Sequence, residues 1–415
     1  MFKINLEKHE SLIEILGNVL VWYNFALFMP FLHILSAEFF PLKNTVQREM
    51  LSFLALSAGL FMRPFGAAVF GPLGDRLGRR KSISISILLM VIPTVCIGLL
   101  PNFRQVGICA PILLLIFRAL QGISLGGEYT TAMVHLVERA PPHRRSFWGS
   151  FTDAGSQIGV LLGGQALVLL HSFFSPEEIY SFAWRIPFLG AVVLAPFSFL
   201  VPASVSNKKD KPKVPIFRTL LKYKKEVLCT ASITAFSAVG FYTLLTFLPY
   251  YLVGTNIMTL QEATTCSVYS TLIMVIFILM GGYLSDTYSK AFFMIFGIVG
   301  VSITMYFMFL LPMTTFKHWL ILQLSYGSFL GLYYSSRAAF FAEAYPEHIR
   351  CTAVSLSLSF AQALFGGMTP LAINYASKIS PLLPAMAVTV IAICAFSALI
   401  ALKKKKLANE RDLHF

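Results

Sequence analysis

Long, mostly apolar stretches, each about the length of a membrane-spanning helix, constrain this chain more than any other feature. A helix needs roughly 20 apolar residues to cross the hydrocarbon core of a bilayer. Twelve stretches meet this condition, and an even number of spans places both chain ends on one side of the membrane. The predicted spans are residues 12–36, 50–71, 82–100, 107–134, 146–170, 184–203, 227–252, 264–285, 291–312, 317–341, 351–376 and 382–402.

Composition supports an all-α membrane protein and argues against a soluble one. The chain has 415 residues, of which 56% are hydrophobic and only 13% charged, whereas about a quarter of the residues in soluble domains are charged. Its net charge of +14 could indicate nucleic-acid binding. Most Lys and Arg residues, however, fall in segments on one side of the predicted spans, as expected of cytoplasmic segments. We therefore predict a multi-pass protein of the cell (inner) membrane with both termini cytoplasmic and no nucleic-acid partner.

The chain also divides into two related halves. Its longest polar stretch, residues 204–226, is rich in lysine and separates a six-helix half at 1–203 from a second at 227–402, which a basic tail at 403–415 follows. The spacing of Glu138, Pro141, His143 and Arg145 recurs in Glu343, Pro346, His348 and Arg350. Parallel repeats of this kind are typical of secondary transporters, so we expect two pseudo-symmetric halves.

The segment from Gly71 to Lys81, with sequence GPLGDRLGRRK, lies between the second and third predicted spans. Its glycines and charges predict a short cytoplasmic loop, and its Gly-x-Leu-x-Asp pattern returns, without most of the basic residues, at Gly282 to Asp286. We interpret these segments, with the repeated Glu–Pro–Arg loops, as a cytoplasmic gate, although a loop that only fixes orientation is the alternative. The predicted gate residues are Gly71, Gly74, Asp75, Arg76, Gly78, Arg79, Glu138, Arg145, Asp286, Glu343 and Arg350.

These motifs resemble those of the major facilitator superfamily, and within it the metabolite:proton symporter branch. The resemblance is carried by the gate segments and by four further stretches, which begin at Arg63, Arg118, Arg144 and Trp184. It implies a fold of twelve helices and a transporter that moves a small polar or zwitterionic metabolite, of the proline or betaine type, together with protons. The same branch includes carriers of dicarboxylates, citrate and shikimate, so a carboxylate or carboxylate siderophore is the alternative substrate.

Ionisable residues within the predicted spans are candidates for substrate and proton binding, because an unpaired charge in a membrane is costly. We predict a network of Arg63, Glu128 and Asp153 in which one carboxylate takes a proton; a permanent structural ion pair is the alternative. Arg118 is expected to meet a carboxylate of the substrate or of a proton-carrying acid. Arg337 is expected to be a residue of the membrane boundary.

The first span departs from the resembling branch, because Val21 and Asn24 occupy positions where that branch has Glu and Asp. If those acids carry coupling or cation recognition in that branch, this chain must use other acids, of which Glu128 and Asp153 are the candidates, or couple differently. Aromatic residues could bind a cationic group through their ring faces, although most aromatics in such a chain pack against lipid or protein. The remaining candidate site residues are Trp22, Tyr23, Asn24, Gln121 and Tyr242.

Other functional classes find little support in the sequence. The six cysteines are scattered, and we find no metal-binding spacing, phosphate loop or Ser–His–Asp grouping, so we predict no enzyme activity, cofactor or metal. A transporter-like membrane receptor is the remaining alternative class. We expect a monomer whose partners are a small-molecule substrate, protons and the lipid bilayer, and whose halves rock to give alternating access.

Overall fold

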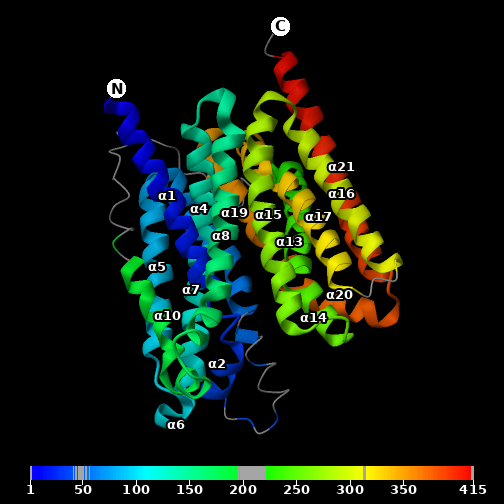
Figure 1. Ribbon diagram of the computed structural model, residues 1–415. Helices are drawn as coiled ribbons and strands as arrows, with labels where there is room; N and C mark the ends of the chain where they lie inside the picture. The colour runs from blue at the N-terminus through cyan, green and yellow to red at the C-terminus, as the bar shows by residue number, and fades with distance from the viewer. Residues whose placement is uncertain are drawn as a thin grey trace. The chain divides into compact units, whose positions relative to one another are not determined.

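The computed structural model describes residues 2–40, 57–194, 221–311 and 315–412, and also residues 42, 44, 51, 54, 55 and 196. Its regular structure in these ranges is helical, with no strand (Figure 1). The elements before residue 195 are α1 (Phe2–Ala26), α2 (Leu32–Phe39), α4 (Arg63–Arg76), α5 (Arg79–Leu99), α6 (Phe103–Val106), α7 (Cys109–Arg139), η1 (Pro142–Arg144), α8 (Arg145–His171), α9 (Pro176–Glu178), η2 (Ile179–Ala183), α10 (Arg185–Gly190) and η3 (Ala191–Leu194).

The elements after residue 220 continue the helical pattern. They are α13 (Lys224–Tyr242), η4 (Thr243–Phe247), α14 (Leu248–Gly254), α15 (Leu260–Thr287), α16 (Lys290–Leu310), α17 (Phe316–Ser335), α18 (Arg337–Glu343), η5 (Glu347–Ile349), α19 (Arg350–Ala361), η6 (Gln362–Gly366), α20 (Gly367–Ile379) and α21 (Leu383–Asp412). The basic tract at 403–406 is thus part of the last helix. Residues 204–220 of the predicted linker lie outside the described residues.

The chain forms two compact units. Unit 1 comprises Met1–Ala132 and Gly155–Lys213, and unit 2 comprises Met133–Ala154 and Val214–Phe415. The predicted halves divide the chain differently, because residues 133–154 pack with the later helices in unit 2.

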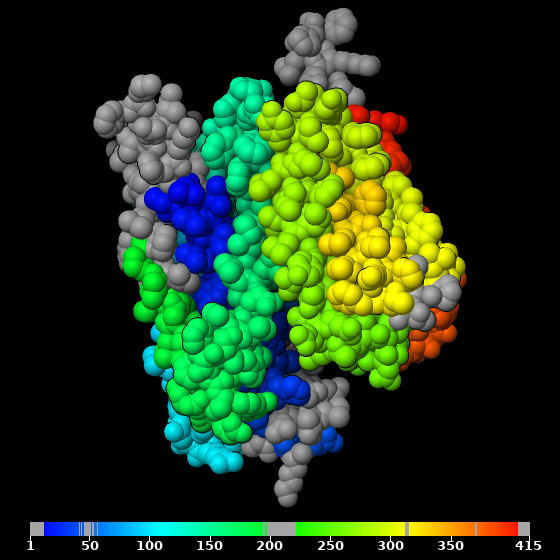
Figure 2. Space-filling model, viewed as in Figure 1, coloured from blue at the N-terminus to red at the C-terminus, as the bar shows by residue number. Residues whose placement is uncertain are grey.

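The prediction of a twelve-span all-α membrane protein is confirmed. Each predicted span coincides with a helix or with consecutive helices wherever the structure describes it. Within the described part of the chain, 8 helices are by themselves long and apolar enough to cross a membrane. In unit 2, α15 covers much of the face shown in Figure 2. The exposed side chains of α15 include Leu272, Ile276 and Met280. An exposed apolar helix surface of this kind suits contact with lipid tails.

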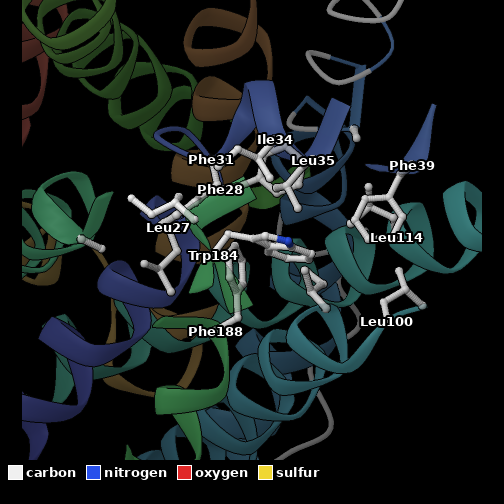
Figure 3. Packing of buried hydrophobic residues seen from close by; sticks show 14 of the residues in the cluster. Leu27, Phe28, Phe31, Ile34, Leu35, Phe39, Leu100, Leu114, Trp184 and Phe188 are labelled. Carbon is white, nitrogen blue, oxygen red and sulfur yellow. The ribbon is translucent and has the colours of Figure 1, made fainter. Parts of the chain in front are cut away.

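The core of unit 1 is built around Trp184, which is fully buried (Figure 3). Its ring meets the rings of Phe39 and Phe188 edge to face. Leucine and phenylalanine side chains from α2, from the end of α5 and from the start of α7 complete the cluster. Next to this cluster, Arg185 donates hydrogen bonds to the carbonyl oxygens of Gly98 and Leu100 at the end of α5, at 2.9 and 2.8 Å.

Glycines bring α4 and α7 into direct backbone contact. A Cβ atom at Gly66 would lie 2.0 Å from a carbonyl oxygen of α7, and one at Gly122 would lie 1.9 Å from the carbonyl oxygen of Gly59. No side chain fits at such distances, so small residues are required for these helices to pack, as in many membrane bundles.

Three prolines coincide with interruptions of the helices. Pro30 lies in the turn between α1 and α2, within the single span predicted at 12–36. Pro249 follows the π-helical segment η4, and Pro370 lies in α20, just after the π-helical segment η6. A proline removes one backbone donor, and a π-helical turn nearby accommodates that loss.

Candidate functional site

Two of the buried arginines of unit 1, Arg63 on α4 and Arg118 on α7, contact aromatic rings of the α1 region. The guanidinium carbon of Arg63 lies 5.7 Å from the centre of the Trp22 ring. That of Arg118 lies 4.7 Å from the Phe25 ring centre and 4.3 Å from that of Phe28. Cation–π contacts of this kind stabilise a guanidinium away from water, and the guanidinium keeps N–H donors in its plane.

Gln121 fixes the position of Arg118. Its amide oxygen accepts a hydrogen bond from Nη1 of Arg118 at 2.7 Å, and its amide nitrogen donates to Oγ1 of Thr94 on α5 at 2.7 Å. The structure therefore brings together two of the predicted site residues, Arg118 and Gln121. A side chain held by such a chain of bonds has a defined orientation for binding a carboxylate.

Helix α1 supplies the next group of predicted residues. Trp22 packs edge to face against Tyr129 of α7, and its indole Nε1 is buried without a hydrogen-bond partner among the described residues. Asn24 donates to the carbonyl oxygen of Leu20 at 2.9 Å, while its own Oδ1 has no partner in the same set of residues. Tyr23 is half-buried and lies where α1 packs on Gly159 and Gly163 of α8.

Asp153 lies in unit 2 and forms an ion pair with Arg337 of α18. Both side chains are buried, and Arg337 also donates from Nη1 to Oγ of Ser237 at 2.8 Å and lies 4.2 Å over the Tyr334 ring. Arg337 was expected only as a residue of the membrane boundary, and the structure adds that its guanidinium is buried inside the protein and paired with a carboxylate. Arg337 is thus a partner of Asp153 that the predicted network of Arg63, Glu128 and Asp153 did not include.

Tyr242, the remaining predicted site residue of unit 2, ends α13 where the π-helical segment η4 begins. Its ring packs on Gly366, the last residue of the second π-helical segment, where a Cβ would lie only 2.8 Å from Cε2. Such π-helical turns are frequent at functional sites. Three buried tyrosines line α17 next to α13, and their hydroxyls donate to carbonyl oxygens of Ile233, Ser237 and Gly240.

The predicted gate segment at Gly71 to Lys81 is more helical than expected. Gly71, Gly74, Asp75 and Arg76 belong to α4, and α5 begins at Arg79. The prediction of a loop across the whole segment is wrong, because only Leu77 and Gly78 interrupt the helices. Gly78 has a φ of 97°, which a side chain would disfavour, and Arg79 donates to Asp75 across this break at 2.5 Å.

The other predicted gate residues meet in unit 2. Asp286, at the end of α15, accepts hydrogen bonds from the backbone N–H groups of Ser146 and Phe147 at 2.7 and 2.9 Å. These groups open α8, directly after Arg145, so the carboxylate caps the positive end of a helix. Arg350 donates to Glu138 at 2.8 Å, and Glu343 pairs with Lys290.

A buried tyrosine, Tyr345, lies beside these ion pairs. Its hydroxyl is within hydrogen-bond distance of the hydroxyls of Thr230, at 3.0 Å, and Ser357, at 3.4 Å. Burial raises the pKa of Tyr345 to about 12, so the phenol stays protonated at neutral pH and can donate to one of the two.

Sequence reasoning missed Glu14 and undervalued Arg337. Glu14 was not among the predicted site residues, yet its side chain is 1% exposed. The available signal was an acid within the first predicted span. For Arg337, the signal was an arginine within a predicted span that also contains Tyr333 and Tyr334.

Comparisons with known proteins agree with this architecture. Residues 15–370 match the family model described as Major Facilitator Superfamily. The chain is 30% identical over 379 residues to the proline/betaine transporter of Escherichia coli (strain K12), covering 86% of this chain and 75% of that protein. It is 32% identical over 399 residues to a protein of Staphylococcus aureus (strain COL) that is provisionally given the same name, covering 92% of this chain and 85% of the relative.

Solved structures show the same fold. The proton:xylose symporter bound to 6-bromo-6-deoxy-D-glucose superposes with a TM-score of 0.78 at 18% identity, covering 95% of this chain and 94% of that one. The human organic anion transporter superposes with a TM-score of 0.71 at 14% identity, covering 95% of this chain and 99% of that one. With its repeated sequence motifs and its helical membrane fold, the chain belongs to the major facilitator superfamily, and the relatives named here are transporters.

Proposed function

We propose that this protein is a secondary active transporter that imports a small zwitterionic metabolite, of the proline or betaine type, together with protons. The observation that carries the proposal is the arrangement of Arg63 and Arg118 against aromatic rings in unit 1. A guanidinium pairs with a carboxylate through its in-plane N–H groups, while the indole and phenyl rings offer surface to an apolar or ammonium-bearing part of the same molecule.

The names of the relatives favour the same substrate class. Two similar proteins are named for proline and betaine, the second provisionally. Both compounds are zwitterions whose carboxylate and substituted nitrogen lie within a few bonds of each other. A site with arginine and aromatic side chains side by side suits such a molecule better than it suits a neutral sugar.

A carboxylate remains the second candidate, and a specific observation favours it. Val21 and Asn24 are both buried and uncharged, so this part of α1 presents no anion to a substrate cation. A dicarboxylate would instead use both buried arginines and require no such anion. The two candidates therefore differ in whether the positive group of the substrate contributes to binding.

Alternating access follows from the repeated architecture. In this scheme the two six-helix halves rock about the substrate site, and the residues at Asp75, Asp286, Glu138 and Arg350 form and break contacts at the cytoplasmic end. The Asp286 carboxylate on the first N–H groups of α8, and the ion pair of Glu138 with Arg350, are the contacts that would have to open.

A thermal-shift screen of the purified protein tests the substrate class. We expect glycine betaine or proline to raise the unfolding temperature, and the change Arg118→Gln to abolish this rise. Arg104→Gln, which alters an exposed arginine on α6, is the matched control and should leave the rise intact. Stabilisation by succinate, citrate or shikimate without any response to zwitterions would refute the leading proposal in favour of the carboxylate candidate.

A further inference from the structure

Glu128 on α7 is a carboxylate in an unusual setting. Its side chain is 0% exposed, and neither of its oxygens has a hydrogen-bond partner among the described residues. A buried carboxylate that is ionised and lacks donors is strongly disfavoured, whereas the protonated acid is neutral and tolerates burial. The geometry therefore indicates that Glu128 carries a proton in this structure.

Its charged neighbour is a second buried acid. Glu14 on α1 is 1% exposed, and α1 packs on α5 at Ile87, next to Ser86, where α7 packs on the same helix. Two carboxylates that share one buried site do not both ionise easily, so the pair retains a proton between them. Glu14 in turn lies 4.0 Å from Nε of Arg80 at the start of α5. That cation offsets one negative charge and leaves the proton on Glu128.

The helices that hold these groups pack directly on one another (Figure 1). Ser124, one turn before Glu128, donates to the carbonyl oxygen of Ser86 on α5 at 2.6 Å, so this face of α7 lies against α5. A Cβ at Gly17, one turn after Glu14, would lie 3.0 Å from Ile87 on the same helix. Helices α1, α5 and α7 thus enclose the two acids from three sides.

Other buried charges on these helices and on α4 have described contacts with other groups. Asp75 on α4 and Arg79 on α5 form an ion pair with each other. Arg63 on α4 contacts the Trp22 ring, and Arg118 on α7 contacts Gln121 and two phenyl rings. From α8, the described contact with α1 is a neutral one, between Asn18 and Ser156 at 3.2 Å. Among the contacts that the structure describes, Arg80 is a cation beside Glu14 of this acid pair.

We propose that Glu14 and Glu128 form the site that binds the transported proton, and that Arg80 controls its release. This inference rests on the proposed proton-coupled function and identifies the acids that carry the coupling where Val21 and Asn24 are uncharged. Arg80 lies two residues after Gly78, the break between α4 and α5 in the predicted gate. A movement at Gly78 that brings Arg80 closer to Glu128 stabilises its ionised form and expels the proton, which links proton release to the gate.

Infrared difference spectroscopy of the purified, reconstituted protein tests the site without any substrate. A protonated buried carboxyl gives a C=O stretching band that shifts in deuterated water, and alkaline titration removes it. We expect such a band in the wild type and its loss in Glu128→Gln. The change Glu14→Gln should move its titration to more acidic pH by about one unit or more, since a like charge is removed.

The change Arg80→Gln should act in the opposite direction, enlarging the band and moving its loss to more alkaline pH. A purely structural role would not move the titration in opposite directions in the two variants, and Arg80→Gln keeps both acids in case Glu128→Gln fails to fold. Glu178→Gln, at an exposed capping position, is the matched control and should leave the band unchanged. A band that is absent from the wild type, or that neither variant moves, would overturn the proposal.

Uptake into proteoliposomes separates this proposal from the proposed function. With radiolabelled glycine betaine, Glu128→Gln should retain exchange across the membrane and lose accumulation driven by a pH gradient. If the wild type shows the titrating band but no such accumulation, the acid pair stands as a proton site and the proposed symport is wrong. If Glu128→Gln accumulates substrate as well as the wild type, symport stands and the assignment of its proton site is wrong.

Discussion

The ion pair of Asp153 with Arg337 gives the most quantitative prediction. The two side chains are 1% and 2% exposed, and the guanidinium also donates to Ser237 and faces the Tyr334 ring. Removing one member leaves its partner charged and buried, which typically destabilises a protein by about 3–5 kcal/mol. We therefore expect both Asp153→Asn and Arg337→Gln to be destabilised on that scale.

Replacing both members should be much milder than either single change. The double variant Asp153→Asn with Arg337→Gln leaves no buried charge at this position, and replacing a whole buried ion pair by uncharged residues is often close to neutral. The effects of the two single changes should therefore be far from additive. Their interaction free energy should be at or above the upper end of the range of about 0.5–3 kcal/mol that is usual for neighbouring residues.

Reversible unfolding in mixed detergent micelles, followed by circular dichroism, measures these free energies. Arg104→Gln serves as the matched control, since that side chain is exposed, and should change stability by no more than about 0.5 kcal/mol. If Arg337→Gln is no less stable than this control, or if the single changes add in the double variant, the assignment of a buried, coupled ion pair is incorrect.

Three further predictions concern packing, the gate and pH. Gly66→Ala should destabilise the protein by about 1–3 kcal/mol, because its Cβ would collide with the backbone of α7, whereas Gly164→Ala, with open space around it, should be neutral in the same unfolding assay. Asp286→Asn should weaken the cap on α8 and raise protease cleavage at residues 140–145, and unchanged cleavage would argue against a closing role. Hydrogen bonds from Ser175 lower the pKa of Glu178, so this cap stabilises the protein above the unfolded-state pKa of about 4.3 and is lost as pH falls through the lowered value. Glu178→Gln should remove that part of the pH dependence in thermal melts, and a melt profile identical to the wild type would contradict it.

The fold could be predicted from the sequence because it depends on patterns that the chain repeats. Apolar stretches of spanning length, basic segments between them and recurring Glu–Pro–Arg loops each follow from the physics of a bilayer. The family assignment rests on the same segments. A departure at Gly71 to Lys81 arose because glycines and charges suggested a loop, while membrane helices tolerate glycine.

The candidate site was less predictable, because it depends on which helices face one another. Sequence distance does not show that Asp153 lies opposite Arg337, since the two residues are far apart along the chain and become neighbours only through packing within unit 2. Similarly, Glu14 becomes a candidate site residue only through its position near Glu128 and Arg80, which lie on two other helices. Arg118 and Gln121, one helical turn apart, are the pair that spacing alone could suggest.

Uptake of radiolabelled glycine betaine and proline into proteoliposomes, with and without an imposed pH gradient, tests the central claim most directly. We expect at least one of these zwitterions to accumulate above equilibrium when the outside is acidic, and a protonophore to abolish the accumulation. The Arg118→Gln variant should lose this uptake, while Arg104→Gln keeps it. Uptake that is equal in the presence and absence of the gradient, or accumulation of succinate or citrate alone, would contradict the proposal of proton-coupled zwitterion transport.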